Sequence, residues 1–140
     1  MQEPALIPEL YCTDFEKSCA FYCDILGFNI LYAREEEKFA KLEREGAEIM
    51  LEQLVHENGR RWISDTLEKP FGRGVNFQIR VSDVSMLYKK VQNSSFETFL
   101  DLEEKWYRMI DKEVGNKQFV VSDPDGYLLR FFEDLGERPI

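Results

Sequence analysis

The order of structural elements predicted along this chain repeats once, and this repeat constrains the fold more than any single motif. Residues 6–54 read as strand, helix and three strands, judged from apolar alternation, helical spacing and turn residues. Residues 75–134 read in the same order. With 140 residues in total, the sequence predicts one α+β domain built of two βαβββ modules, about 5–56 and 72–136.

Two pairs of matched residues set the register of the repeat. Asp14 and Asp83 each precede a helical pattern as N-cap residues, which gives an offset of 83 − 14 = 69. Gly46 and Gly126 each close a turn before a strand, which gives an offset of 126 − 46 = 80. The second module therefore gains 80 − 69 = 11 residues, which we place around the Trp-Tyr pair at 106–107.

Composition narrows the class of protein. Hydrophobic residues make up 44% of the chain, which is enough for a packed core, and the net charge of −9 disfavours a nucleic-acid partner. An acidic surface either serves solubility or attracts a cationic ligand. Three cysteines without a disulfide pattern, no signal peptide and no membrane-spanning run indicate a cytoplasmic protein. Cys19 and Cys23 have the spacing of a metal clamp on a helix, but with one histidine in the chain buried thiols are favoured.

The last predicted strand raises the question of an arginine on an apolar face. In DPDGYLLRFFED (123–134) a turn is followed by alternation, which puts Arg130 between Leu128 and Phe132. An unpaired buried charge is costly, so the favoured interpretation is a buried ion pair. Binding of an anionic ligand group, or a buried stem whose head is tied to a neighbouring acid, stays open. The candidate ion-pair partners are Glu52 and Asp111.

Three segments carry a resemblance to a known family: YCTDFEKSCAFYCDILGF (11–28), GRGVNFQIRVSDV (72–84) and QFVVSDPDGYLLRFFEDLG (118–136). With them the chain resembles the vicinal oxygen chelate superfamily, which includes glyoxalase I, extradiol dioxygenases, and the fosfomycin- and bleomycin-resistance proteins. The resemblance implies two βαβββ modules whose mixed sheets curl around a cleft. It is specific for the fold, which hosts many activities.

In the metal-dependent members, four inward positions hold His, Gln or Glu, and the resemblance maps these positions onto residues that are poor ligands. They are Ile7, Met50, Asn76 and Arg130, in agreement with the repeat, since 7 + 69 = 76 and 50 + 80 = 130. A guanidinium repels a divalent cation, so we expect no metal, no cofactor and no catalytic residue. The alternative is a metal-dependent lyase, isomerase or dioxygenase. It requires a register slip to recruit Glu9 or Glu52, because the one histidine, His56, falls in a predicted loop.

The KWYRM segment and the terminal RFFEDLG are typical of the bleomycin-resistance branch. This resemblance implies a non-catalytic homodimer that sequesters bleomycin-like cationic drugs in a cleft at the dimer interface. Trp106 and Tyr107 point to opposite faces of a strand, so one can stack on a ligand while the other fills a core or a dimer interface. Trp62 either roofs the cleft or packs in the core. The predicted ligand-binding residues are Trp106, Tyr107, Phe132, Arg130, Asn76, Met50 and Trp62.

The N-terminal segment bears on the partner. Pro4 and Pro8 flank the first predicted strand, and in the resistance-protein relatives a proline there accompanies exchange of the N-terminal arm between subunits. We therefore expect a homodimer with a swapped arm, and neither a nucleic-acid nor a membrane partner. A third hypothesis is a scaffold or sensor whose cleft is filled by its own side chains.

Overall fold

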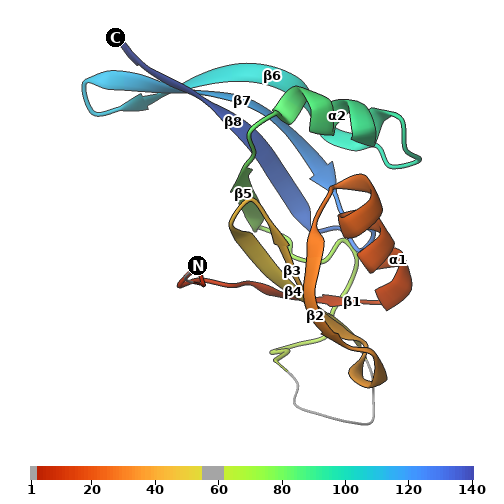
Figure 1. The fold of residues 1–140 in the computed structure, drawn as a ribbon. Helices are drawn as coiled ribbons and strands as arrows, with labels where there is room; N and C mark the ends of the chain where they lie inside the picture. Colours follow the sequence, from red (N-terminus) through yellow and green to blue (C-terminus); the bar gives the residue numbers. More distant parts are fainter. Residues whose placement is uncertain (1–2, 55–61) are drawn as a thin grey trace. The chain divides into compact units, whose positions relative to one another are not determined.

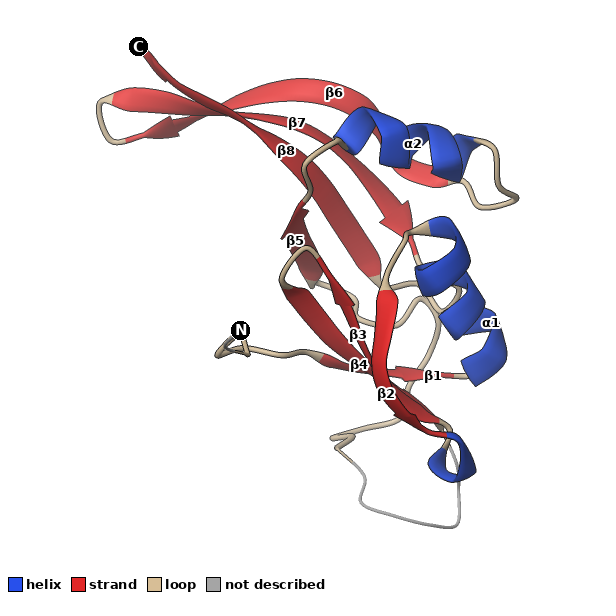
Figure 2. Cartoon of the chain, viewed as in Figure 1, coloured by secondary structure: helices blue, strands red, loops and turns tan. Residues whose placement is uncertain are grey.

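The computed structural model describes residues 3–54 and 62–140 and divides into two compact units. Each unit contains one four-stranded mixed sheet, not closed into a barrel, with a helix packed on one side (Figure 1, Figure 2). The predicted α+β class is therefore confirmed. Among the described residues, no helix is both long and apolar enough to cross a bilayer. The first unit comprises Met1–Arg73 with Pro124–Gly126, and the second comprises Gly74–Asp123 with Tyr127–Ile140.

The sheet of the first unit has the strand order β1-β4-β3-β2, in which β1 runs parallel to β4 and the other pairs are antiparallel. A 3-10 turn stands where the sequence was ambiguous over 35–44, and a strand follows it. The elements are β1 (Glu9–Cys12), α1 (Phe15–Ala20), a π-helical turn η1 (Phe21–Ile25), β2 (Asn29–Arg34), a 3-10 turn η2 (Glu35–Glu37), β3 (Phe39–Arg44) and β4 (Ala47–Gln53).

The helical segment of the first unit begins and ends as its sequence predicts. The Asp14 carboxylate accepts a hydrogen bond from the Lys17 backbone N–H at 3.2 Å, which satisfies one of the free N–H groups at a helix start. Gly27 follows the π-helical turn with a φ of +77°, a conformation that glycine adopts at little cost. Between them Phe15, Tyr22 and Leu26 are buried against the sheet.

The sheet of the second unit has the order β5-β8-β7-β6, again with one parallel pair, β5 and β8. Its hairpin strands are longer than predicted: the segments at 96–100 and around 106–107 belong largely to one strand, and the last strand continues beyond Asp134. The inserted residues of the repeat therefore lie in long paired strands. The elements are β5 (Asn76–Arg80), α2 (Val84–Gln92), β6 (Thr98–Met109), β7 (Lys112–Ser122) and β8 (Leu128–Pro139).

Each sheet has a helix face and an open face, which we define as the side away from its helix. On the helix face of the second unit, Phe119, Leu129 and Phe131 are fully buried, and Tyr88 of α2 meets Phe119 edge-on at 5.3 Å between ring centroids. Arg130 and its neighbours in alternation occupy the open face. Both faces read as apolar in sequence, but only the helix face forms the core.

Two corresponding hydrogen bonds agree with the register of the predicted repeat. The Phe15 backbone N–H donates to Gln53 Oε1 at 2.9 Å, and the Val84 N–H donates to Glu133 Oε1 at 3.1 Å. These pairs differ by the predicted offsets, since 15 + 69 = 84 and 53 + 80 = 133. In both units the last strand therefore supplies a side chain that caps the helix.

The turn between β7 and β8 belongs to the first unit. Its Asp125 is buried, and the carboxylate accepts hydrogen bonds from the Thr13 N–H at 3.1 Å and the Thr13 hydroxyl at 2.6 Å. The Asp125 carbonyl accepts from the Phe71 N–H at 2.8 Å, and Lys69 Nζ lies 3.3 Å from the carboxylate. A short turn thus joins two separate stretches of the first unit, one at Thr13 and one at 69–71.

Candidate functional site

A pocket of about 440 Å³ lies on the open face of the second sheet. This volume is within the range of sites that hold small organic molecules. Alternation along β6, β7 and β8 brings its side chains to one side of the sheet, and the neighbouring strand β5 adds one more. The lining residues are Gln78, Tyr107, Val114, Asn116, Arg130, Phe132 and Asp134.

Arg130 lies in this pocket beside a neutral partner. Its Nη2 donates to Gln78 Oε1 at 2.9 Å, while its Nε is shielded from solvent and has no hydrogen-bond acceptor among the described residues. The predicted ion pair with Asp111 is wrong, because Asp111 lies in the turn between β6 and β7 whereas Arg130 is paired with Val120. Glu52 belongs to the first unit, and its pairing with Arg130 stays a prediction.

A hydrogen-bond chain fixes the hydroxyl of Tyr107. Gln118 Nε2 donates to Glu103 Oε2 at 3.0 Å and to the Tyr107 oxygen at 2.7 Å. Because a carboxylate only accepts, Glu103 sets the orientation of the Gln118 amide, and the Tyr107 oxygen is then the acceptor. The Tyr107 hydroxyl proton is left to donate elsewhere, and the ring stands at the pocket wall.

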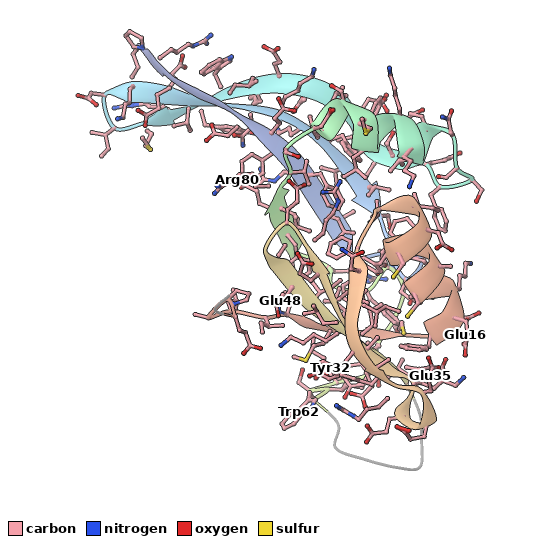
Figure 3. The ribbon with its side chains drawn as sticks, in the orientation of Figure 1. Glu16, Tyr32, Glu35, Glu48, Trp62 and Arg80 are labelled. Atoms are coloured by element: carbon pink, nitrogen blue, oxygen red, sulfur yellow. The ribbon has the colours of Figure 1, made fainter. Side chains whose placement is uncertain are left out.

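Three polar side chains in or near the pocket shape its polarity. Asn116 is buried and follows an irregularity in the pairing of β7 with β8, which sets its position opposite Asp134. Asp134 is exposed and accepts a hydrogen bond from the Gly136 N–H at 2.8 Å. The guanidinium carbon of Arg80 (labelled in Figure 3) lies 5.9 Å from the centroid of the Phe132 ring. The pocket therefore combines aromatic walls with charges of both signs.

The structure separates the adjacent Trp106 and Tyr107. Trp106 lies on the other side of the sheet, where its ring packs so close to Gly115 that a Cβ there would come within 2.6 Å of it. The guanidinium carbon of Arg138 stacks 4.0 Å from the centroid of the Trp106 ring. Tyr107 is therefore the residue of the pair that lines the pocket.

The other predicted site residues lie outside this pocket. Asn76 pairs with Leu128, two residue pairs before Gln78 pairs with Arg130 on the same two strands. Met50 and Trp62 belong to the first unit. The Trp62 side chain is exposed, and its backbone N–H donates to the Tyr11 hydroxyl oxygen at 3.2 Å.

Sequence reasoning missed four of the lining residues. Gln78 could have been found from the parallel pairing of β5 with β8, which sets Arg130 opposite Gln78 rather than Asn76. Asp134 shares the predicted face of Arg130 and Phe132 but was not chosen as a site residue. Val114 and Asn116 lie in the early part of β7, which begins before the predicted strand, so their shared face was not visible in the pattern. The missed residues are Gln78, Val114, Asn116 and Asp134.

The open face of the first sheet carries a cation with carboxylate partners. Lys41 is buried, its Nζ lies 3.2 Å from Glu48 Oε1, and it also pairs with Glu3 (Glu48 is labelled in Figure 3). On the same face, burial raises the pKa of Glu9, and the nearby Glu52 charge raises it further. Burial also raises the pKa of Glu52, with a contribution from Glu37. This face is strongly acidic around one neutralised lysine.

The cross-strand pairs at the predicted metal positions do not fit a divalent metal. Met50 is paired with Glu9 in the first unit, and Arg130 is paired with Gln78 in the second, while Ile7 precedes β1. A thioether is a soft ligand, and the only amide oxygen of Gln78 already accepts from a guanidinium that would repel a cation.

Comparisons with known proteins match this chain over nearly its whole length. The model of the glyoxalase/bleomycin resistance protein/dioxygenase superfamily matches residues 6–131. A bleomycin resistance protein of Geobacillus stearothermophilus is 28% identical over 138 residues, covering 92% of this chain and 96% of that protein. A bleomycin resistance protein of Staphylococcus aureus matches with the same identity and coverage.

Solved structures show the same fold. The structure of TioX from Micromonospora sp. ML1 has a TM-score of 0.70 at 19% identity, and the match covers 93% of this chain and 98% of that chain. A superfamily member from Vibrio splendidus 12B01 is 40% identical, covering 91% of this chain and 95% of that chain, with a TM-score of 0.42. Of these two, it is the TioX structure that shows the likeness of fold.

Proposed function

Because the chain belongs to the glyoxalase/bleomycin resistance protein/dioxygenase superfamily, we propose that it is a non-catalytic protein that binds and sequesters a small organic molecule of the bleomycin-like, cationic aromatic class. The proposal is supported by the similarity to bleomycin resistance proteins at 28% identity. It is also supported by the residues at the family's metal positions, which do not fit a metal.

The observation that carries the proposal is the pocket on the open face of the second sheet. Tyr107 and Phe132 offer ring surfaces on which a planar group of a ligand can stack. Gln78, Asn116 and Arg130 supply hydrogen-bonding groups around them. A largely pre-formed pocket with a few converging polar groups is the usual form of a small-molecule site.

The mechanism we propose is retention rather than reaction. The acidic surface of the chain, with a net charge of −9, raises the local concentration of a cationic ligand and speeds its encounter. Aromatic contacts then hold the planar part of the ligand, and the exposed carboxylate of Asp134 faces a cationic part. A ligand held in this way is withdrawn from its target.

We also propose that the protein is a cytoplasmic homodimer in which the two units form one domain. An interface is supported by β2, an edge strand whose Ile30, Leu31 and Tyr32 are about half exposed. An exchanged N-terminal arm is supported by Leu6, which precedes β1 and is 82% exposed. Sedimentation equilibrium tests the dimer: twice the 16.6 kDa of one chain is expected, and the mass of one chain would contradict it.

The ligand is tested by calorimetric titration of metal-analysed protein with copper-bleomycin and with metal-free bleomycin. Saturable binding of about one drug per chain is expected in protein that contains no bound metal. Tyr107→Ala should weaken binding by about tenfold or more, because a stacked ring contributes roughly 1 kcal/mol beyond the apolar area it buries. Trp106→Ala is the matched control, since this neighbouring ring lies on the other face of the sheet and its loss should leave the affinity unchanged.

The outcomes separate the proposal from its rival. No heat with either drug form removes bleomycin as the ligand. A stoichiometric, tightly bound transition metal in the purified protein would instead support the metal-dependent enzyme that the sequence left as the alternative. Loss of binding in Trp106→Ala but not in Tyr107→Ala would move the site to the other face of the sheet.

A further inference from the structure

Arg130 is a cation that forms no ion pair with the described residues of its own unit. No carboxylate of the described part of the second unit forms an ion pair with it, and its hydrogen-bond partner is the neutral amide of Gln78 at 2.9 Å. A guanidinium carries five N–H donors, and leaving a buried donor without an acceptor costs about 1–3 kcal/mol. The Nε of Arg130 is such a donor: it is buried and has no hydrogen-bond acceptor among the described residues.

The first unit provides an internal reference for this arrangement. The cross-strand pair Lys41–Met50 on its open face corresponds to the pair Val120–Arg130 on the open face of the second unit. Each unit thus has one cation in this cross-strand pair of its open face: Lys41 on β3 in the first unit and Arg130 on β8 in the second. Lys41 is neutralised by Glu48 and Glu3, whereas Arg130 is left with an amide. The scaffold can supply carboxylates to such a cation, and the second unit does not.

Two other side chains offer hydrogen-bond donors in the same pocket as Arg130. Since the Tyr107 oxygen accepts from Gln118, its hydroxyl proton is available to a ligand atom in the pocket. Asn116 adds an amide to the lining, and the Phe132 ring lies next to Arg130 in the alternation of β8. Donors and ring surfaces therefore meet in one pocket.

We infer that the pocket binds an oxyanion carried on a planar aromatic group, with the oxyanion on the guanidinium of Arg130 and the ring against Tyr107 and Phe132. The inference rests on the proposed ligand-binding function and defines a chemical group that its ligand must carry. Arg130 then gains a charge-assisted hydrogen bond, which is stronger than a neutral one. Asp134 at the side of the pocket disfavours a dianion and accepts a cationic group elsewhere on the same ligand, so a zwitterionic aromatic molecule fits the proposed acidic surface as well.

The test uses three probes that share a ring system and differ in charge: 2-naphthoate, 2-naphthalenesulfonate and the neutral 2-naphthamide. Binding is followed on the full ¹⁵N-labelled chain by NMR, where an arginine Nε–H gives its own signal. Both anions should bind about tenfold more tightly than the amide, as expected for one charge-assisted bond. The Arg130 Nε–H signal should shift with the anions, and acetate, which lacks a ring, should bind more weakly than either.

Variants locate the preference at one side chain. Arg130→Gln should abolish the tenfold preference for the anions over 2-naphthamide. Arg130→Lys, which keeps the charge but not the planar fork, should keep part of it. Arg138→Gln is the matched control, because it removes the same charge from the same strand, and Arg138 stacks on Trp106 on the other face.

Every outcome decides the inference. Equal affinity for the anions and the amide, or an anion preference that survives Arg130→Gln, overturns it. If none of the three probes binds while copper-bleomycin does, the inference fails and the proposed function stands. If neither the probes nor bleomycin bind, both fail.

Discussion

The two units of this chain use the same scaffold with different open faces. In both, an Asp caps the helix start, and a side chain of the last strand accepts a hydrogen bond from the first helical residue: Gln53 for Phe15, and Glu133 for Val84. On the open faces, Lys41 lies among carboxylates, whereas Arg130 lies beside an amide in a pocket. The contacts that hold a helix on its sheet are repeated, and the side chains of the open faces are not.

This difference shows where a duplicated architecture is free to change. Helix faces must fill a core at high packing density, so both units place fully buried Leu or Phe there, as at Leu51 and Phe131. Open faces are not bound by this requirement. A Met–Arg difference at 50 and 130 and a Lys–Val difference at 41 and 120 change the chemistry of a face without disturbing the register.

The largest expected effect concerns the two matched turn glycines. A Cβ on Gly126, which has a φ of +109°, would come within 2.5 Å of the Pro70 Cα, so Gly126→Ala should lower the free energy of unfolding by about 3 kcal/mol. A Cβ on Gly46 would meet nothing within 4 Å. Gly46→Ala should therefore lower the free energy of unfolding by only about 1 kcal/mol, because of its φ of +93°. Urea denaturation measures both, and equal losses would show that the Pro70 contact is unimportant.

The second prediction exchanges the two cations for a neutral side chain. Lys41→Met should lower the thermal midpoint by several degrees, because Glu48, with a side chain only 12% exposed, then loses its cationic partner. Arg130→Met should hold or raise the midpoint, since it removes a cation without a carboxylate partner. Calorimetric scans of the two variants check the contrast, and a greater loss for Arg130→Met would reverse our view of the two faces.

The third prediction compares the two caps supplied by the last strands. Gln53→Ala and Glu133→Ala each remove the acceptor of a helical N–H, so each should lower the free energy of unfolding by about 1 kcal/mol. Glu133→Gln, which keeps an amide oxygen as in the first unit, should lose less than Glu133→Ala. Chemical denaturation of the three variants measures this, and a full loss in Glu133→Gln would mean that charge rather than the hydrogen bond matters.

The smallest expected effect is a pH dependence confined to the first unit. The pKa values of Glu9 and Glu52 are raised above 4.5 by burial, so the folded chain holds these protons more tightly than the unfolded one. The stability that this proton binding adds to the folded state is then lost as the pH rises from about 4.5 through the raised pKa values. The double variant Glu9→Gln/Glu52→Gln should therefore have a free energy of unfolding about a few tenths of a kcal/mol higher than the parent at neutral pH. The gain is this small because solvent screens both partly exposed groups.

Stability measured against pH tests this last prediction. The variant should show a flatter curve than the parent above pH 4.5, because the two groups no longer release protons. An unchanged curve would mean that Arg34, whose charge opposes both shifts, already balances them.

The sequence predicted the scaffold well because the scaffold rests on local signals. N-cap residues, turn glycines and apolar alternation are all readable from short windows, and the offsets of 69 and 80 match the observed pairings Glu9–Met50 and Gln78–Arg130. The resemblance to the superfamily is confirmed by the family match over residues 6–131. His56, which the sequence placed in a loop, lies outside the described residues.

The site was harder to predict because it depends on pairing between strands distant in sequence. Arg130 and Phe132 were identified from alternation in one strand, and Tyr107 from its aromatic neighbour. Gln78 was missed because its importance comes only from the parallel register of β5 with β8. Trp106 could not be told from Tyr107 without knowing which side of β6 faces the pocket.

The turn between β7 and β8 has a consequence for the order in which this protein is made. Asp125 supplies the carboxylate that Thr13 uses and the carbonyl that Phe71 uses, although 112 residues separate Thr13 from Asp125. On a ribosome, the N-terminal half leaves the exit tunnel long before this turn is synthesised. The early half of the chain must therefore wait for almost the last segment before its own set of hydrogen bonds is complete.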